Sequence, residues 1–178
     1  MVQFSLEKKE IVYKIVYCGP YLSGKTSTLK FIHKKTISEN LGEMSSIITS
    51  SKENMYVDFL CVEVGEIEGL NSKFNIFGLP GSPEYYSVYK NFLIDVDGIV
   101  FVADSCKIEE NIASFRNMQQ ILEQLGYSLD KIPIVIQWNK KDAPESLPIS
   151  ILHEKINTIQ VPEFPTSSIT GDGILNSL

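Results

Sequence analysis

The chain has 178 residues, a length typical of a single domain that buries a sizeable core. Hydrophobic residues make up 43% of it and charged residues 21%, which excludes a chain that is disordered throughout. The net charge of −6 argues against nucleic acid as the main partner, because surfaces that bind nucleic acid are basic.

The cysteines and histidines predict no metal site. Cys18, Cys61 and Cys106 lie far apart in or beside apolar runs, as expected of reduced, buried thiols in a cytoplasmic protein. His33 and His153 are isolated, which favours a place on a helix surface over a ligand or catalytic role. Neither end carries a long apolar stretch or a prenylation cysteine, so we expect no direct membrane anchor.

The first predicted strand, residues 11–18, leads directly into a glycine-rich segment, Gly19-Pro20-Tyr21-Leu22-Ser23-Gly24-Lys25-Thr26. We call residues 19–26 the phosphate loop, because they have the Gly-x-x-x-x-Gly-Lys-Thr spacing that binds nucleotide phosphates. Lys25 would reach the β- and γ-phosphates, and the Thr26 hydroxyl would ligate Mg²⁺. A helix over residues 26–35, with Ser27 in its first turn, would direct its positive N-terminal end at the phosphates. A chance glycine-rich turn is the alternative.

The next segments predict an antiparallel strand pair. Residues 38–54 are polar and show no helical or strand period, so we expect a mobile loop there. Two β-rich runs follow at residues 56–64 and 73–77. The connection between them is too short for a crossover helix, which favours an antiparallel pair.

The rest of the chain alternates apolar runs with helix-period segments, which is typical of a mostly parallel sheet covered by helices. Strands are expected at residues 98–103, 132–138 and 164–167, and helices at residues 83–94, 109–125 and 145–158. We therefore predict one α/β domain over residues 1–178, with a mostly parallel six-stranded sheet, one antiparallel strand and helices on both faces. Only five residues follow Gly173, so the C-terminal helix is expected to be short or truncated.

A second motif predicts which base is bound. Asn139, Lys140, Lys141 and Asp142, which we call the guanine motif, match the Asn-Lys-x-Asp pattern directly after the strand at residues 132–138. The Asp142 carboxylate can accept two hydrogen bonds from the guanine edge, whereas a mismatched base would leave polar groups unpaired at a cost of about 1 to 3 kcal/mol. The carboxyl end of a strand is also where open α/β sheets bind ligands. An ordinary solvated turn is the alternative.

Residues 166–173, which we call the base loop, resemble the Ser-Ala-Lys base-contact loop of Ras-like GTPases, with Ser168 in the place of alanine. With the phosphate loop and the guanine motif, the order and spacing resemble a Ras-like G domain, a P-loop NTPase fold, over nearly the whole chain. The closer resemblance is to the MglA family of bacterial gliding-motility GTPases. It rests on residues 14–20, 57–60, 64–67, 96–105 and 131–140.

The resemblance implies a cytoplasmic switch that binds GTP and GDP with Mg²⁺ and helps to set cell polarity, recruited to a cell pole through partners. It implies a roadblock-type, MglB-like dimer as the activating partner, further effectors, and a chain that is a monomer or a weak dimer by itself. The strand at residues 56–64 would slide against the sheet on nucleotide exchange. The implied nucleotide contacts are Gly19, Tyr21, Leu22, Ser23, Gly24, Lys25, Thr26, Ser27, Gly81, Asn139, Lys140, Asp142, Ser167, Ser168 and Ile169.

The second switch departs from the Ras-like pattern. Residues 78–82 correspond to Asp-x-x-Gly-Gln, so Gly78 replaces the aspartate and Ser82 the glutamine, with Pro80 between them. MglA proteins generally lack this aspartate too, and Gly78 is therefore a mild departure. Ser82 is a serious one, because a hydroxyl is too short to bridge water and phosphate as a carboxamide does. Ser82 and Lys25 are the candidate catalytic residues.

The first switch departs as well. Glu53 lies where MglA proteins carry an intrinsic arginine, and Asn54 lies where they carry the Mg²⁺-binding threonine. Asn54 would offer an amide oxygen to the metal, whereas Glu53 would add negative charge near an anionic transition state. Tyr21 takes a phosphate-loop position that is often glycine, and its ring would cover the γ-phosphate or hinder an incoming arginine.

No arginine finger is expected from within the chain. Arg116 is the only arginine in the sequence, and it lies in the predicted helix at residues 109–125, remote from the nucleotide. A finger contributes about 10³ to 10⁵ in rate, or roughly 4 to 7 kcal/mol of barrier, so we expect slow turnover. Two hypotheses stay open: a slow or partner-dependent GTPase switch, and a catalytically inactive pseudo-GTPase that acts as a scaffold. A small-molecule kinase is disfavoured, because those enzymes commonly use several lid arginines.

Overall fold

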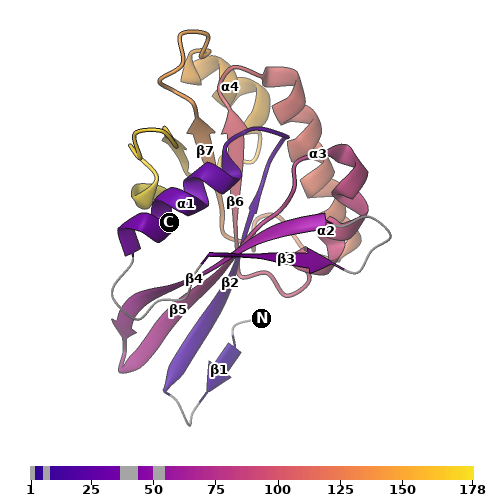
Figure 1. Cartoon of the computed structure of the whole chain (residues 1–178). Coiled ribbons are helices and arrows are strands. Elements are labelled where there is room, and N and C mark those ends of the chain that lie inside the picture. The colour runs from indigo at the N-terminus through magenta and orange to yellow at the C-terminus, as the bar shows by residue number, and fades with distance from the viewer. Residues whose placement is uncertain (1–2, 6–8, 37–43, 50–54) are drawn as a thin grey trace.

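The computed structural model describes residues 3–5, 9–36, 44–49 and 55–178, and Figure 1 shows the arrangement of its elements. The elements are β1 Gln3–Ser5, β2 Glu10–Cys18, α1 Lys25–Thr36, β3 Ser45–Thr49, β4 Met55–Ile67, β5 Leu70–Gly78, the 3-10 helix η1 Pro83–Tyr85, α2 Tyr86–Leu93, β6 Gly98–Asp104, α3 Ile108–Gln124, β7 Ile134–Asn139, α4 Ile149–Ile156, β8 Glu163–Pro165 and the 3-10 helix η2 Leu175–Ser177.

One mixed sheet forms the centre of the molecule. Its strands follow the order β3-β4-β5-β2-β6-β7-β8, and β1 pairs with β2 off this path. The strands β5, β2, β6, β7 and β8 run parallel to one another. The predicted antiparallel pair is confirmed as β4 and β5, and the α/β class with a mostly parallel core is confirmed with it. The sheet has two strands more than the six expected, because β1 and β3 add antiparallel pairs.

The strand β3 corrects the expectation of a loop throughout residues 38–54. Ser45 pairs with Phe59 and Thr49 with Met55, so β3 extends the sheet beyond β4. The segment contains Ile47, Ile48 and Thr49, and β-branched residues favour a strand even where a five-residue element is too short to show a period. Residues 38–43 and 50–54 of the expected loop lie outside the described residues.

The helices agree with the sequence except at two starts. The helix expected over residues 145–158 begins only at Ile149, because Pro148 has an extended ψ of 135° and stands at its N-cap. The segment expected over residues 83–94 is divided into the 3-10 turn η1 and the helix α2, with Pro83 at the first position of the turn. None of the helices in the described part of the chain is long and apolar enough to cross a lipid bilayer.

Helices cover both faces of the sheet, as predicted. Successive residues of β2 point to opposite faces: Val16 and Cys18 pack on one side, and Tyr17 packs on the other. The first side carries α2, α3 and α4, represented by Tyr89 and Met118, and the second carries α1. Because the central strands are buried on both sides, they form the rigid base from which the loops at the carboxyl ends extend.

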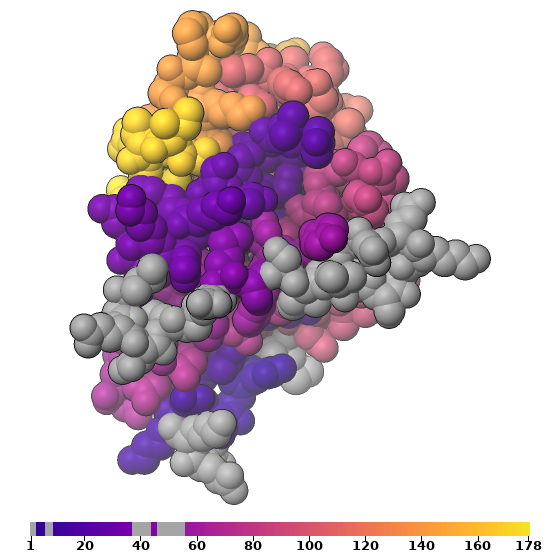
Figure 2. Space-filling model, in the orientation of Figure 1, coloured from indigo at the N-terminus to yellow at the C-terminus, as the bar shows by residue number. Residues whose placement is uncertain are grey.

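The chain after β8 packs beside α1. Ile174 and Ser177 are buried, and Gln137 Nε2 of β7 donates a hydrogen bond of 2.7 Å to Ser177 Oγ. Figure 2 shows the C-terminal residues, in yellow, next to α1, in indigo, and a Cβ at Gly171 would lie 1.9 Å from Phe31 Cε2. The expected short C-terminal helix is the single turn η2.

Candidate functional site

The site lies where the loops at the carboxyl ends of β2, β5, β7 and β8 meet. Backbone hydrogen bonds join these loops: Leu79 N donates to Tyr17 O at 2.9 Å, and Lys141 N donates to Thr166 O at 3.2 Å. The phosphate loop, the second-switch segment, the guanine motif and the base loop therefore come together at one edge of the sheet, where an open α/β sheet binds its ligand.

The two glycines of the phosphate loop are required by close approach. Gly19 has φ +142°, and a Cβ there would lie 2.2 Å from Val102 O. Gly24 has φ +102°, and its Cβ would lie 2.1 Å from Asn139 Nδ2. Side chains at these positions would push the loop away from β6 and from the guanine motif.

Lys25 is held inside the phosphate loop. It is 7% exposed, and its Nζ donates hydrogen bonds to Gly19 O at 2.9 Å and to Pro20 O at 2.7 Å. Burial lowers the pKa of Lys25 to about 8, and the nearby Cys18 and Asp58 act in the opposite direction. The ammonium is thus kept at the place where phosphate oxygens would take over its hydrogen bonds.

Thr26 has a partner that the sequence did not reveal. Its Oγ1 donates a hydrogen bond of 2.6 Å to Asp58 Oδ2, and Asp58 lies on β4 opposite Gly78 of β5. A Cβ at Gly78 would lie 2.7 Å from Leu29 Cδ1 and 3.2 Å from Asp58 Cβ. Asp58 therefore delivers from the neighbouring strand the carboxylate that the Asp-x-x-Gly pattern would place at position 78.

The donor set at Thr26 suits a nucleotide-bound magnesium ion. Mg²⁺ at such sites is held by one or two protein groups together with phosphate oxygens, and Thr26 and Asp58 supply a hydroxyl and a carboxylate side by side. In the part of the chain that the structure describes, no three acidic, cysteine or histidine side chains form a metal cage. Glu53 and Asn54 lie outside the described residues.

Asn139 connects three loops. It is fully buried, its Nδ2 donates to Ser23 O at 2.7 Å and to Ser168 Oγ at 3.2 Å, and its Oδ1 accepts from Ser168 N at 2.8 Å. One side chain thus ties the phosphate loop to the base loop. Within the base loop, Ser167 is buried and Ile169 is exposed.

The three charged residues of the guanine motif face different surroundings. Lys140 Nζ lies 2.6 Å from Asp104 Oδ2, and Lys141 Nζ forms an ion pair with Asp172 Oδ2. Asp142 is exposed, and it forms no hydrogen bond or ion pair with the residues that the structure describes. Its carboxylate is therefore available to a ligand.

The second-switch segment is pressed against the phosphate loop. A Cβ at Gly81 would lie 2.4 Å from Pro20 C and from Tyr21 N. The buried Tyr89 holds the segment from behind, because its hydroxyl donates to Pro80 O at 2.7 Å. Ser82 follows at the N-cap of η1, and its side chain makes no capping hydrogen bond.

A cavity of about 360 Å³ lies between the phosphate loop and the second-switch segment. Tyr21 and Leu22 lie exposed at this cavity. Its lining is Tyr21, Leu22, Gly24, Lys25, Thr26, Ser27, Tyr56, Asp58, Gly78, Leu79, Pro80, Gly81, Ser82 and Tyr85. The guanine motif and the base loop stand next to this cavity through the contact of Asn139 with Gly24.

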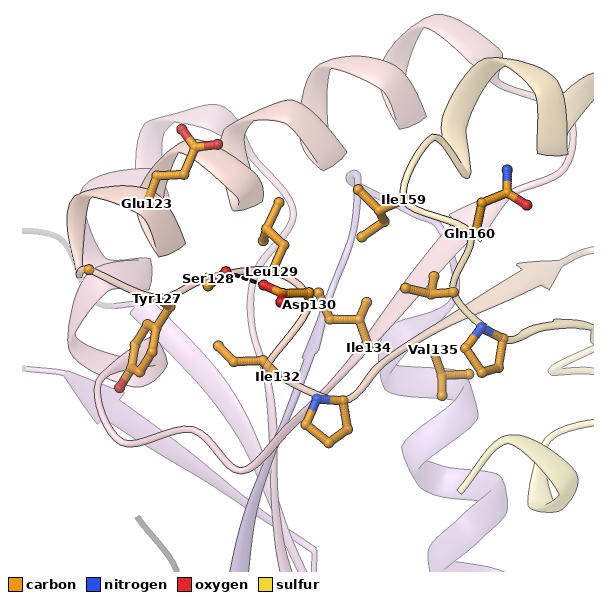
Figure 3. A pocket seen from close by; sticks show the side chains of 14 residues that line it. Glu123, Tyr127, Ser128, Leu129, Asp130, Ile132, Ile134, Val135, Ile159 and Gln160 are labelled. Atoms are coloured by element: carbon orange, nitrogen blue, oxygen red, sulfur yellow. Dashed lines mark hydrogen bonds between the residues drawn. The ribbon is translucent and has the colours of Figure 1, made fainter.

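A larger cavity, of about 1020 Å³, lies at the other end of β7. Figure 3 shows Leu129, Ile132 and Ile159 around it. None of the predicted site residues lines it. Arg116 is exposed on α3, and it does not line the site cavity either.

The comparison with known proteins agrees with this geometry. The model of the ADP-ribosylation factor family, Arf, matches residues 2–178. The mutual gliding-motility protein MglA of Myxococcus xanthus (strain DK1622) is 39% identical over 172 residues, which cover 96% of this chain and 88% of that protein.

More distant relatives share the same region. A Ras and EF-hand domain-containing protein homolog of Caenorhabditis elegans is 24% identical over 174 residues, 95% of this chain but 25% of that protein. The human ADP-ribosylation factor-like protein 4C is 25% identical over 123 residues, 64% of this chain and 60% of that protein. The chain belongs to the Arf family of Ras-like small GTPases, and within it to the family of the gliding-motility protein MglA.

Proposed function

We propose that this chain is a molecular switch that binds GTP and GDP with Mg²⁺ and hydrolyses GTP slowly or only with a partner. The observation that carries the proposal is the position of Asn139, whose side chain bonds the phosphate loop at Ser23 and the base loop at Ser168. A triphosphate at Lys25 and a guanine at Asp142 would therefore occupy two ends of one site.

The metal would bind at Thr26 and Asp58. When bound, Mg²⁺ neutralises charge on the phosphate oxygens. The Thr26 hydroxyl and the Asp58 carboxylate are the groups of this chain that would hold it, directly or through water. Asn54 would add an amide oxygen from the first switch.

Slow hydrolysis follows from the groups that this site contains. Lys25 would stabilise charge on the β- and γ-phosphates, but Ser82 carries a short hydroxyl where a carboxamide would orient water. The single arginine of the sequence, Arg116, is exposed on α3 away from the cavity. A partner that supplies an arginine or orders the second switch would supply what this chain lacks.

The relative from Myxococcus xanthus is named for gliding motility. On that resemblance, we propose a role in motility or cell polarity for this chain, with a roadblock-type, MglB-like dimer as the activating partner. The contact surface would include residues 78–86 and the first switch, and the chain would act in the cytoplasm as a monomer or weak dimer.

A second candidate is a pseudo-GTPase that holds its nucleotide, or none, and serves as a scaffold. Ser82 and the charge of Glu53 favour it. The intact positions of Lys25, Thr26 and Asn139 oppose a loss of binding.

Two measurements test binding and separate these candidates. Protein purified without added nucleotide is denatured with acid, and the released nucleotide is identified by chromatography. We expect guanine nucleotide at a stoichiometry near one, and conversion of added GTP to GDP by the same protein would show residual hydrolysis. Asn139→Ala should weaken GDP binding by at least about 10-fold, because it removes the connection between the two loops. A protein without nucleotide that also fails to bind added GDP would support the scaffold instead.

A further inference from the structure

We propose that Asp104 is a positioning residue for guanine recognition, which holds the Lys140 ammonium away from Asp142 so that this carboxylate stays available to the base. The inference rests on the proposed guanine-nucleotide function. Lys140 and Lys141 directly precede Asp142, and an ion pair with either lysine would occupy the acceptor sites that a guanine edge needs. The structure contains a separate carboxylate for each of these lysines.

Asp104 is built into the end of β6. Its side chain is 1% exposed, Oδ1 accepts a hydrogen bond of 3.0 Å from Cys106 N, and Oδ2 lies 2.6 Å from Lys140 Nζ. The buried Asn111 of α3 fixes the same backbone unit: its Oδ1 accepts from Asp104 N at 2.9 Å, and its Nδ2 donates to Asp104 O at 2.7 Å. A buried carboxylate with such fixed geometry needs its cation, and so it retains Lys140.

Hydrogen bonds also fix the backbone of the guanine motif. Lys140 has φ +64°, a left-handed conformation that is uncommon for a residue with a side chain. Ser105 N donates to Asn139 O at 2.9 Å, and Ala143 N donates to Lys140 O at 3.0 Å. Lys140, Lys141 and Asp142 therefore lie within one four-residue turn, and the direction of the lysine side chains decides whether the carboxylate is paired.

Asp172 of the base loop plays the same part for Lys141, but more weakly. Its side chain is 65% exposed, and a hydrogen bond from Lys141 lowers the pKa of Asp172. Exposed ion pairs are weak and screened by salt. The pair of Lys140 with the buried Asp104 is therefore the stronger of the two.

The test compares GDP with IDP, which lacks the 2-amino group of guanine. In Asp104→Asn, the neutral side-chain amide no longer forms an ion pair with the Lys140 ammonium, so the Asp142 carboxylate becomes the stronger partner for that ammonium. We expect GDP affinity to fall about 10-fold and the preference for GDP over IDP to fall at least about 3-fold, because the carboxylate no longer receives the 2-amino group. The matched control is Glu110→Gln, which removes an exposed contact of 4.0 Å with Lys107 and should leave both affinities unchanged.

Two further variants separate positioning from a loss of structure. In a Lys140→Gln background the Lys140 ammonium is absent and Lys141 keeps its partner Asp172, so adding Asp104→Asn should change the GDP preference by less than about 2-fold. Asp172→Asn, at an exposed position that the fold tolerates, should lower the preference by about 2-fold in low salt and not in high salt.

The outcomes are distinguishable. A GDP preference that stays at the wild-type value in both Asp104→Asn and Asp172→Asn would overturn the positioning role, as would an effect of Asp104→Asn that persists in the Lys140→Gln background. A wild-type protein that binds GDP no better than ADP would instead overturn the proposed guanine-nucleotide function, and the inference would fall with it.

Discussion

Among single residues, Asp58 and Gly78 depend on each other, because the glycine leaves the space that the Asp58 carboxylate occupies. They are paired across β4 and β5, and the Asp58 carboxylate lies against Thr26 in space that a side chain at position 78 would crowd. The carboxylate that is missing at position 78 is thus present at position 58, beside the hydroxyl that we propose as a magnesium ligand.

Replacing Asp58 by Asn should therefore weaken the response to magnesium. The amide still accepts a hydrogen bond from Thr26 but no longer carries the charge that Mg²⁺ requires. We expect GDP to dissociate about 10-fold faster than from the wild type when Mg²⁺ is present, and at a similar rate when EDTA removes it. Release of a fluorescent GDP analogue measures both rates.

The matched control is Glu63→Gln on the same strand, which weakens a contact of 3.5 Å with Lys73 away from the site. It should leave the magnesium response unchanged. If Mg²⁺ slows GDP release from Asp58→Asn as strongly as it slows release from the wild type, Asp58 has no part in holding the metal.

The Lys25 ammonium should make nucleotide affinity depend on pH. Burial lowers its pKa to about 8 in the nucleotide-free protein, whereas phosphates favour the charged form. GDP affinity should be highest below pH 8 and should fall by up to about 10-fold for each pH unit above it. Titrations of a fluorescent GDP analogue between pH about 6.5 and about 9 measure the trend.

The stability of the nucleotide-free protein should change in the opposite direction. Because the folded-state pKa of Lys25 is below its usual value of 10.5, the unfolded chain holds this proton to higher pH. The contribution of Lys25 to the free energy of unfolding therefore rises as pH increases from about 8 to about 10.5. GDP affinity that stays constant from pH about 7 to about 9 would contradict a lowered pKa of Lys25 in the nucleotide-free protein.

At the scale of elements, the segment after β5 and the phosphate loop act as one unit. Gly81→Ala would place a Cβ 2.4 Å from Pro20 C, so one of the two loops must move. We expect GTP and GDP affinities to fall at least about 10-fold, with a loss of unfolding free energy of no more than about 2 kcal/mol because the strands are untouched. Calorimetric titration and thermal unfolding measure the two effects.

Glu84→Ala, an exposed change in η1, is the control for Gly81→Ala and should leave both quantities unaltered. Nucleotide affinity at the wild-type level in Gly81→Ala would show that the contact with Pro20 has no role in binding.

The sequence predicts the helices and strands that have a hydrophobic period of their own. It does not predict an element whose formation depends on pairing with another strand. The apolar run before the phosphate loop and the helix period of α3 were sufficient to predict β2 and α3. The strand β3 was missed because its pairing with β4 stabilises a segment that has no period of its own. The start of α4 was placed too early, since helix-forming residues precede Pro148.

The site shows the same division. The sequence predicts the phosphate loop and the guanine motif because their chemistry follows from spacing within one segment, and the structure brings the two segments into contact. The sequence does not predict the proposed role of Asp58, because that role depends on the β4–β5 register, although a single acid within the apolar run of residues 56–62 is a signal. Asp104 was missed because its contact with Lys140 spans β6 and β7.

In the molecule as a whole, the loops of the proposed nucleotide site come together, and the proposed slow hydrolysis makes position 82 the one to test. Ser82→Gln restores the carboxamide of the Ras-like pattern at the edge of the cavity, next to Gly81. It should raise the rate of GTP hydrolysis by at least about 10-fold without a partner, while Ser82→Ala should stay within about 2-fold of the wild type. Phosphate release under single-turnover conditions compares the three proteins, and a rate in Ser82→Gln equal to that of Ser82→Ala would show that position 82 does not limit hydrolysis.

The proposed function is that of a guanine-nucleotide switch that binds tightly and hydrolyses slowly by itself. Its most direct test is single-turnover hydrolysis of bound GTP, with the wild-type chain in excess, Mg²⁺ present and no partner. We predict that GTP stays bound and is hydrolysed with a rate constant on the order of 10⁻³ s⁻¹ or lower. A rate constant of about 1 s⁻¹ or more, typical of a GTPase with its activating partner, would contradict the account.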